Sequence, residues 1–309
     1  MKKVFALAPS EDWIVDRWVK EWYEYNPDMS VARPEESDVI WLLADWCWNQ
    51  IDTSLLSQKK VVATVHHVTP GKFGKNELNE FLFRDKFVDV YHVPCEKTRE
   101  QIKNLTDKPV IKILPWVNQN IWYQDDNAGK ELRKKLNISD ETYLVGSFQR
   151  DTEGKDLVTP KLEKGPDRFC DIVISMSKTS VRPVEVLLGG WRRQYVMNRL
   201  SREGIKYHYI ERSSFKTVND MYNAIDLYIV AARYEGGPQS IVECALTRTP
   251  IISTDVGFAS EILHPVSIFD GTVASFNLAK VDVDHPRQVI EKQMIPNGFI
   301  PFKELFLGM

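Results

Sequence analysis

The stretch RYEGGPQSIVECAL, from Arg233 to Leu246, comes just after the apolar run Leu227–Ala231. The apolar run is typical of a buried strand. Two glycines and a proline then turn the chain, and the pattern from Gln239 or Ser240 onward predicts a helix. Such a helix presents free backbone N–H groups at the carboxyl end of a strand. Because these N–H groups and the helix dipole favour an anion, we predict a strand, turn and helix that cradle a diphosphate.

Short apolar runs alternate with helical patterns on both sides of this stretch, which is typical of βαβ units around parallel sheets. The runs lack strict polar alternation, as expected for strands that are covered on both faces. In the first third, the predicted strands are Val4–Ala8, Val39–Ala44, Lys60–Val65, Val88–Val93 and Val110–Leu114. A second series is predicted at Tyr143–Phe148, Val184–Leu188, Ile205–Ile210, Leu227–Ala231, Pro250–Thr254 and Val266–Phe269. The sequence therefore predicts an α/β protein with two doubly wound, Rossmann-like domains.

A polar segment at residues 118–130, followed by one short predicted helix at Glu131–Leu136, separates the two series. We place the domain boundary in this segment. The expected domains are residues 1–120 and residues 121–294. The final segment, about residues 295–309, mixes Phe and Leu with charge and is expected to pack back onto the first domain.

Composition narrows the classes of partner. The 309 residues are 43% hydrophobic and 27% charged, which is ordinary for a globular protein, and the formal net charge of −3 gives no reason to expect a nucleic-acid partner. No apolar run approaches the roughly 20 residues that cross a bilayer. Four cysteines, far apart and without a C-x-x-C pair, fit a reducing compartment: Cys47, Cys95, Cys170 and Cys244. We therefore expect a cytoplasmic protein.

The spacing of Glu235 and Glu243 resembles the E-x7-E element of retaining glycosyltransferases of the GT-B fold, particularly the family 4 class (glycosyl transferases group 1). Three further segments resemble this family in the same order: VGSFQR at 145–150, KGPD at 164–167, and TPIISTDVG at 249–257 with Glu261-Ile262 beyond it. The resemblance covers roughly residues 143–265. It implies two Rossmann-like parallel-sheet domains facing across a cleft. It also implies a nucleoside-diphosphate sugar as donor substrate and no obligatory metal or other cofactor.

The resemblance also implies roles for individual residues. Glu235 would hold hydroxyl groups of the transferred sugar, and Glu243 would hold the ribose. Arg150 and a lysine would neutralise the departing diphosphate, because fixed cations stabilise developing negative charge without reorganising. The turn and the helix start would face the diphosphate through Gly236, Gly237, Pro238 and Ser240.

The sequence departs from the family between Arg150 and Lys164, because Asp151–Glu163 is longer than the usual spacer. Either Lys155 or Lys164 is therefore a candidate for the phosphate lysine. We prefer Lys164, which keeps its Gly-x-Asp context. Lys155 lies in a charged segment that is expected to be a flexible solvated loop or a lid.

The first domain carries fewer signals. Where family members have a glycine-rich loop, this chain has Pro9-Ser10-Glu11-Asp12, in which Ser10 is a good helix N-cap. His66 and His67 follow the third predicted strand, at the place where family members carry a histidine near the reacting sugar. We expect at least one of them in the cleft, where it would bind a sugar hydroxyl or orient the acceptor. The sequence does not choose between the two.

Three other motifs receive simpler interpretations. Asp282-Val283-Asp284 has the D-x-D form of a metal site, but Asp284 fits better as a helix cap, and no metal is expected. Arg133-Lys134-Lys135 and Arg192-Arg193 are interpreted as solvated faces or helix ends. A peripheral contact between these basic residues and an acidic lipid surface is an alternative that nothing else indicates.

The sequence thus predicts a retaining glycosyltransferase that moves a sugar from a nucleoside-diphosphate sugar to an unidentified acceptor. The acceptor would be a glycan, a glycolipid or a small molecule. Two alternatives stay open: a nucleotide-sugar epimerase or hydrolase on the same fold, and a non-catalytic homologue that only binds a nucleotide sugar.

Overall fold

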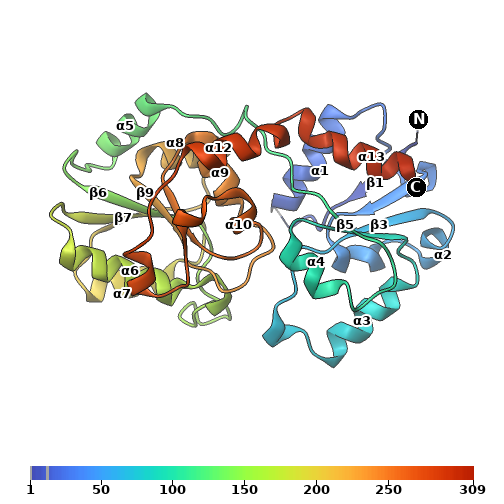
Figure 1. Cartoon of the computed structure of the whole chain (residues 1–309), viewed down its shortest axis with the longest axis horizontal. Helices are drawn as coiled ribbons and strands as arrows, with labels where there is room; N and C mark the ends of the chain where they lie inside the picture. Colours follow the sequence, from blue (N-terminus) through green and yellow to red (C-terminus); the bar gives the residue numbers. More distant parts are fainter. Residues whose placement is uncertain (1, 12–13) are drawn as a thin grey trace. The chain divides into compact units, whose positions relative to one another are not determined.

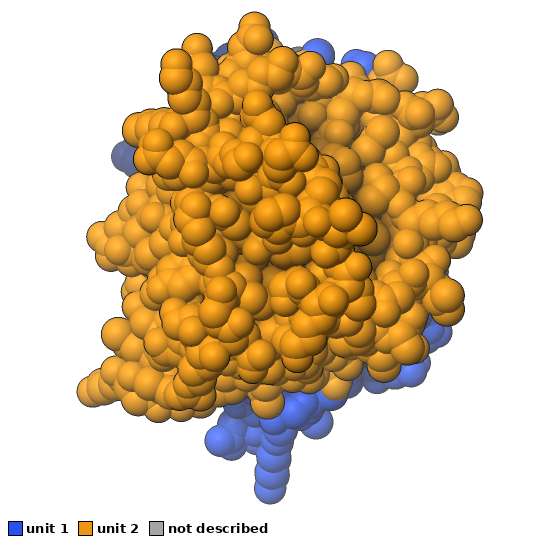
Figure 2. Space-filling view, turned by 90° about the vertical axis from the view of Figure 1, so that its left-hand side faces the viewer, with its two compact units in different colours: residues 1–116, 295–309 blue, residues 117–294 orange. Residues whose placement is uncertain are grey.

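A computed structural model describes residues 2–11 and 14–309 and divides the chain into two compact units, coloured separately in Figure 2. Unit 1 consists of residues 1–116 and 295–309, and unit 2 consists of residues 117–294. Each unit is built on one parallel sheet with helices on both faces (Figure 1). The predicted architecture of two parallel-sheet α/β domains is confirmed.

The sheet of unit 1 follows chain order, β1-β2-β3-β4-β5, and every neighbouring pair is parallel. Its strands are β1 (Val4–Leu7), β2 (Val39–Leu42), β3 (Lys60–Thr64), β4 (Val90–Val93) and β5 (Val110–Lys112). All five predicted strands are present, with ends within two residues of those expected. Because the order never reverses, this sheet has no switch point at which adjacent connections diverge.

Two helical layers cover this sheet. Its helices are α1 (Ile14–Tyr25), α2 (Thr53–Leu56), α3 (Lys75–Asp85), α4 (Glu96–Ile102) and α13 (Ile300–Gly308). The helices α1 and α13 share one buried aromatic core, in which the Trp22 ring lies 5.6 Å from Trp41 and 5.4 Å from Phe306, centroid to centroid. The C-terminal helix therefore completes the core of unit 1, and loss of the buried Phe302 and Phe306 would expose the face of the first sheet.

The sheet of unit 2 has the order β11-β10-β9-β6-β7-β8, again with every pair parallel. Its strands are β6 (Tyr143–Ser147), β7 (Val184–Gly189), β8 (Tyr207–Ile210), β9 (Leu227–Val230), β10 (Ile251–Thr254) and β11 (Ile268–Phe269). All six predicted strands are present. The chain builds outward from β6 to β8, then returns to the other side of β6 to form β9, so the strand order reverses between β6 and β9.

Helices pack on both faces of this sheet, with α6 and α7 on one face and α5, α8 and α9 on the other (Figure 1). The helices of unit 2 are α5 (Asp126–Lys135), α6 (Pro166–Thr179), α7 (Gln194–Arg202), α8 (Phe215–Ala224), α9 (Gln239–Thr247), α10 (Ala259–Ile262), α11 (Val273–Phe276) and α12 (Asp284–Val289). In the part of the chain that the structure describes, no helix is long and apolar enough to cross a membrane.

Three local predictions about helix starts need correction or comment. The helix expected from Glu131 begins five residues earlier, because the Asp125 side chain accepts a hydrogen bond from the N–H of Ala128 and caps α5. Asp284 is not the cap of α12, since Asp282 accepts from the N–H groups of Asp284 and His285. Near Ser10, the carboxylate of Asp16 accepts from the backbone N–H groups of Ser10 and Glu11. Asp12 lies outside the described residues.

Candidate functional site

The carboxyl ends of β6 and β9 lie side by side at the point where the strand order of unit 2 reverses. In open α/β sheets, ligands bind beyond the carboxyl ends of the strands at such a switch point. The segment after β6 carries Arg150, and the segment after β9 carries Glu235. The topology therefore brings these two predicted site residues to one edge of one sheet.

Lys164 and Glu235 form an ion pair between Lys164 Nζ and Glu235 Oε1. Lys164 ends a short 3-10 turn, Leu162–Lys164, just before α6, and Glu235 lies in the loop after β9. Their side chains are 25% and 11% exposed, so a carboxylate and an ammonium group meet in a partly desolvated position. Opposite charges held this way are available to a charged ligand at this sheet edge.

A second ion pair fixes the backbone on which Glu235 lies. The guanidinium of Arg233 binds the Asp167 carboxylate in a bidentate manner, with distances of 2.7 and 2.6 Å. The N–H of Arg233 also donates to the carbonyl oxygen of Glu163 at 2.7 Å. Burial alone would raise the pKa of Asp167, but the Arg233 guanidinium holds this pKa below its usual value. The loop after β9 is thus fastened to the start of α6.

Gly237, in the turn after β9, has a packing role that the sequence did not indicate. A Cβ atom placed on Gly237 would lie 2.0 Å from Cε1 of Phe258, which is fully buried. We expected the Gly236-Gly237 pair to permit close approach to a ligand. At Gly237 the close approach that requires glycine is made by the Phe258 ring.

The helix α9 begins at Gln239 after Pro238, and no side chain caps its N-terminus. Ser240 lies in its first turn. Glu243 lies one turn inside the helix, as predicted; its side chain is buried and accepts a hydrogen bond of 2.7 Å from the Tyr222 hydroxyl. Burial raises the pKa of Tyr222 well above its usual value, and the neighbouring Glu243 carboxylate raises it further.

Arg150 is half-buried at the end of the segment that follows β6. Its Nε donates to the carbonyl oxygen of Thr152 at 2.7 Å, and its guanidinium lies over the Trp191 ring, 5.3 Å from the centroid. The planar cation is therefore held by one hydrogen bond and one aromatic face.

Lys155, the other candidate lysine, is exposed on the segment between Asp151 and Lys161. This segment is a small hairpin, with an antiparallel bridge between Thr152 and Pro160. The segment that we expected to be a flexible solvated loop or a lid is thus a hairpin with its own backbone hydrogen bonds. Of the two lysines, Lys164 is the one that contacts another predicted site residue.

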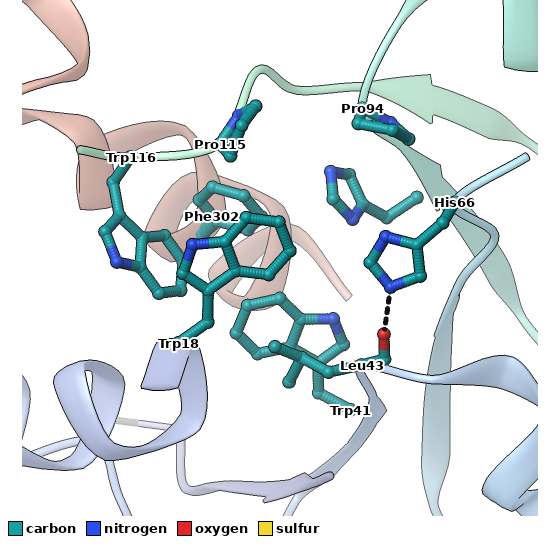
Figure 3. A pocket seen from close by; sticks show the side chains of 9 residues that line it. Trp18, Trp41, Leu43, His66, Pro94, Pro115, Trp116 and Phe302 are labelled. Atoms are coloured by element: carbon teal, nitrogen blue, oxygen red, sulfur yellow. Dashed lines mark hydrogen bonds between the residues drawn. The ribbon is translucent and has the colours of Figure 1, made fainter. Parts of the chain in front are cut away.

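His66 and His67 follow β3 in unit 1 and differ in their surroundings. The ring of His66 stacks on Trp18 at 5.9 Å, and its Nε2 lies 2.8 Å from the carbonyl oxygen of Leu43 (Figure 3). Burial lowers the pKa of His66. His67 is exposed. Within unit 1, the His66 ring therefore packs against Trp18 and the Leu43 carbonyl group, whereas His67 is exposed.

His66 lines a small aromatic pocket at the carboxyl end of the first sheet, together with Trp18, Trp41 and Phe302 (Figure 3). The pocket encloses about 10 Å³, room for about one water molecule and far less than a sugar ring needs. Its lining is almost wholly apolar. As it stands, this pocket is part of the core packing of unit 1 rather than a sugar subsite.

His92, which also lines this pocket, gives unit 1 a predictable pH dependence. Its Nε2 lies 3.0 Å from the carbonyl oxygen of Ile113, and its Nδ1 lies 2.9 Å from the hydroxyl of Thr64, which also accepts from Trp41 Nε1. The carbonyl requires Nε2 to carry the proton, so the neutral ring accepts at Nδ1. Burial lowers the pKa of His92 to about 4.

In the unfolded chain His92 takes up its proton near the ordinary pKa of about 6.5, so between this value and about 4 the unfolded state binds more protons. The free energy of unfolding of unit 1 is expected to fall by up to about 3 kcal/mol as the pH drops through this window. Urea unfolding across the window would measure it. The His92→Gln chain keeps a donor and an acceptor but does not titrate, so its free energy of unfolding should fall less steeply as the pH drops from about 6.5 to about 4. If the wild type and the variant show the same pH dependence, His92 is not the group responsible.

Among residues 2–11 and 14–309, no group of three or more His, Cys, Asp or Glu side chains is arranged to hold a metal ion. Asp282 and Asp284 of the D-x-D motif have separate roles, because Asp282 accepts from the first two N–H groups of α12 and Asp284 pairs with Arg248.

Residues 160–299 match the family model described as glycosyl transferases group 1. This part of the chain is a glycosyl transferases group 1 domain. The match includes the Lys164–Glu235 pair, the turn after β9 and the helix α9. A curated relative, the lipopolysaccharide core biosynthesis mannosyltransferase LpsB of Rhizobium meliloti, is 24% identical over 160 residues, which are 50% of this chain and 43% of that protein. The matched region thus spans less than half of that relative's length.

Solved structures of glycosyltransferases share the fold of the whole chain. The structure of Anabaena Alr3699/HepE in complex with UDP and glucose has a TM-score of 0.77 at 14% identity and covers 99% of both chains. Sucrose-phosphate synthase from Thermosynechococcus elongatus has a TM-score of 0.71 at 13% identity, covering 98% of this chain and 81% of that one. The predicted fold is thus confirmed for the chain, and the predicted family is confirmed for residues 160–299.

Two charged residues of unit 2, each expected on a solvated face or at a helix end, lie at helix ends but are not solvated. Arg193, directly before α7, is fully buried and pairs with the buried Asp151. Arg133, in the last turn of α5, binds the carbonyl oxygens of Ala224 and Thr142. The only signal in the sequence was that Arg193 sits directly before an amphipathic helix, which is weak evidence for burial.

Proposed function

We propose that this chain is a retaining glycosyltransferase that binds a nucleoside-diphosphate sugar in unit 2 and transfers the sugar to an acceptor held by unit 1. The observation that carries the proposal is the Lys164–Glu235 ion pair at the switch point of the second sheet, with Arg150 on the neighbouring segment. One edge of one sheet thus supplies two cations, a carboxylate and a helix N-terminus.

Each of these groups suits a different part of the donor. Lys164 and Arg150 would stabilise the negative charge that develops on the departing diphosphate, and the N-terminus of α9 would add N–H groups. Glu235 would accept hydrogen bonds from sugar hydroxyls. Glu243 would reach the ribose while Tyr222 fixes its carboxylate. Since the phosphates would replace Glu235 as the partner of Lys164, donor binding would free the carboxylate for the sugar.

The named relatives support a donor of this chemical class. Structures of Anabaena Alr3699/HepE are complexes with UDP and with UDP-glucose, and LpsB is named as a mannosyltransferase of lipopolysaccharide core biosynthesis. We therefore propose a nucleoside diphosphate as the leaving group and a glycan or glycolipid as the acceptor. We place the reaction in the cytoplasm, on the sequence evidence given above.

A nucleoside diphosphate should raise the melting temperature of unit 2. A ligand that binds only the folded state adds about 2.7 kcal/mol at 100 times its Kd, which corresponds to about 5–10 °C for a domain of this size. Thermal unfolding with UDP, GDP and ADP in separate samples would measure it. Uridine, guanosine and adenosine are the matched controls, because they lack the phosphates. If no diphosphate shifts the melting temperature beyond its nucleoside, the donor site is assigned wrongly.

Product analysis separates transfer from the alternatives. The sugar form of the best diphosphate, incubated alone, should persist, whereas a glycan acceptor should receive the sugar with its anomeric configuration retained. An isomerised sugar without acceptor would indicate an epimerase, and free sugar would indicate a hydrolase. Tight binding without turnover on any acceptor would indicate a non-catalytic homologue.

A further inference from the structure

The hairpin between Asp151 and Lys161 in unit 2 is held by its own backbone hydrogen bonds. The N–H of Glu153 donates to the carbonyl oxygen of Thr159 at 3.0 Å, and the N–H of Lys161 donates to that of Asp151 at 2.8 Å. Asp151 and Thr152, at its base, are 1% and 0% exposed, whereas its tip is exposed. The base of the hairpin, its root, is thus buried in the domain, and the Arg192 guanidinium also donates to the carbonyl oxygen of Gly154 nearer its tip.

The buried side chain of Arg193 binds this root. Arg193 is 0% exposed, and its Nε donates to Asp151 Oδ2 at 2.8 Å. Its two other nitrogens donate to the carbonyl oxygen of Gly189 at 2.7 Å, to the hydroxyl of Ser147 at 3.0 Å and to the Ser147 carbonyl oxygen. Ser147 ends β6 and Gly189 ends β7. One guanidinium therefore ties the carboxyl ends of two strands to the hairpin.

Asp151 receives support from the helix that Arg193 begins. Burial raises the pKa of Asp151, while Arg193 and the backbone N–H groups of Tyr195 and Val196, in the first turn of α7, lower it. A carboxylate beside a helix N-terminus is favoured as the anion. A backbone bond from the N–H of Asp151 to the carbonyl oxygen of Arg192, 3.2 Å long, joins the same two segments.

This root lies between the two cations of the proposed donor site. Arg150 directly precedes Asp151, and its Nε donates to Thr152 in the base of the hairpin. On the other side, the Lys161 N–H is bound to Asp151, and the carbonyl oxygen of Lys161 accepts from the N–H of Lys164. The indole that carries the Arg150 guanidinium, Trp191, is two residues from Arg193. A shift of Asp151 would therefore move both cations.

We infer that Arg193, through its buried pair with Asp151, is a positioning residue that sets Arg150 and Lys164 for the diphosphate of the donor. Arg193 is fully buried and bound on every nitrogen, so it acts on the ligand through these two residues and not by contact. This inference rests on the proposed function, since it assigns the diphosphate to those two cations. Lysine could not replace it, because an ammonium group lacks the planar fork that reaches two strands and a carboxylate together.

The sharpest test replaces both partners. Removing one would leave a buried charge unpaired and unfold the chain, whereas exchanging a buried ion pair for apolar residues of similar volume is often neutral or stabilising. We expect the Arg193→Met, Asp151→Leu chain to stay folded with a lowered melting temperature, because the Ser147 and Gly189 carbonyl oxygens lose a donor, and to bind UDP, GDP or ADP about 10- to 100-fold more weakly. The single variant Arg193→Lys keeps a charge opposite Asp151 and should lose affinity for the diphosphate to a smaller extent. If the double variant does not fold, this single variant tests whether Arg193 is a positioning residue.

Two further readouts separate positioning from general stability. Adding Arg150→Ala to the double variant should weaken diphosphate binding no further, because the two changes remove one shared effect. Amide hydrogen exchange at residues 152–161 should rise in both Arg193 variants. The matched control is Arg199→Met with Asp171→Leu, an Arg–Asp pair between α7 and α6 that does not touch the hairpin.

The outcomes distinguish this inference from the proposed function. If Arg150→Ala weakens diphosphate binding but both Arg193 variants bind like the wild type, Arg193 is not a positioning residue. If the wild-type chain binds none of the three diphosphates, the proposed function fails, and hydrogen exchange alone then reports whether Arg193 holds the hairpin.

Discussion

Replacing Glu235 with glutamine is expected to lower the rate of sugar transfer by at least about 100-fold, with little change in the melting temperature. Glutamine has the same size, but it carries no charge and can no longer accept hydrogen bonds on both oxygens. Lys164 would then lack its carboxylate before the donor binds, and the sugar hydroxyls would lack a charged acceptor. Steady-state kinetics with the donor identified by thermal unfolding would measure kcat and KM separately.

The matched control for this variant is Glu203→Gln, which makes the same chemical change on an exposed residue at the end of α7 in the same unit. Its turnover should equal that of the wild type. We expect the loss at Glu235 to appear mainly in kcat, because the contact with the transferred sugar matters most as the glycosidic bond breaks. Wild-type turnover by the Glu235→Gln chain on a confirmed donor would show that the site is assigned wrongly.

The strands and the edge that carries the site could be predicted from the sequence because they depend on local patterns. Most of the strands follow short runs rich in Val, Ile and Leu, and parallel strands connected by helices place their carboxyl ends together. The E-x7-E spacing also follows from one local element, the turn and helix after β9. Lys164 could be preferred over Lys155 from its sequence context alone, and the structure brings Lys164 into contact with Glu235.

The contacts that hold the site could not be predicted, because their partners are distant in sequence and carry no local signal. Arg233 pairs with Asp167 and Arg193 with Asp151, across 66 and 42 residues. A buried arginine looks like any exposed one in a single sequence. The helix α5 also begins earlier than expected, because its cap Asp125 and the preceding Tyr123 are held by side chains of α8, Asn223 and Asn219.

Gly165→Ala is expected to destabilise unit 2 more than a glycine-to-alanine change at any other position would. Gly165 lies between Lys164 and α6, at a φ of +63°, where a residue with a side chain costs about 1–2 kcal/mol. A Cβ atom at this position would also lie 1.8 Å from the carbonyl oxygen of Ala231, at the end of β9. Because that oxygen belongs to the backbone beside the site, it cannot move aside like a flexible side chain.

Gly204→Ala isolates the steric part of this effect. Gly204 has a similar φ of +69°, but nothing lies within 4 Å of the place its Cβ would occupy. We expect about 1 kcal/mol of destabilisation at Gly204 and at least about 4 kcal/mol at Gly165, a range in which single changes need a specific cause. Chemical unfolding of the three chains would measure both. If the two variants lose the same free energy of unfolding, the backbone at the start of α6 shifts at little cost. A segment that shifts so easily could not hold Lys164 against Glu235. A much larger loss at Gly165 would instead show that close packing between the start of α6 and β9 fixes the two charges on which the proposed chemistry depends.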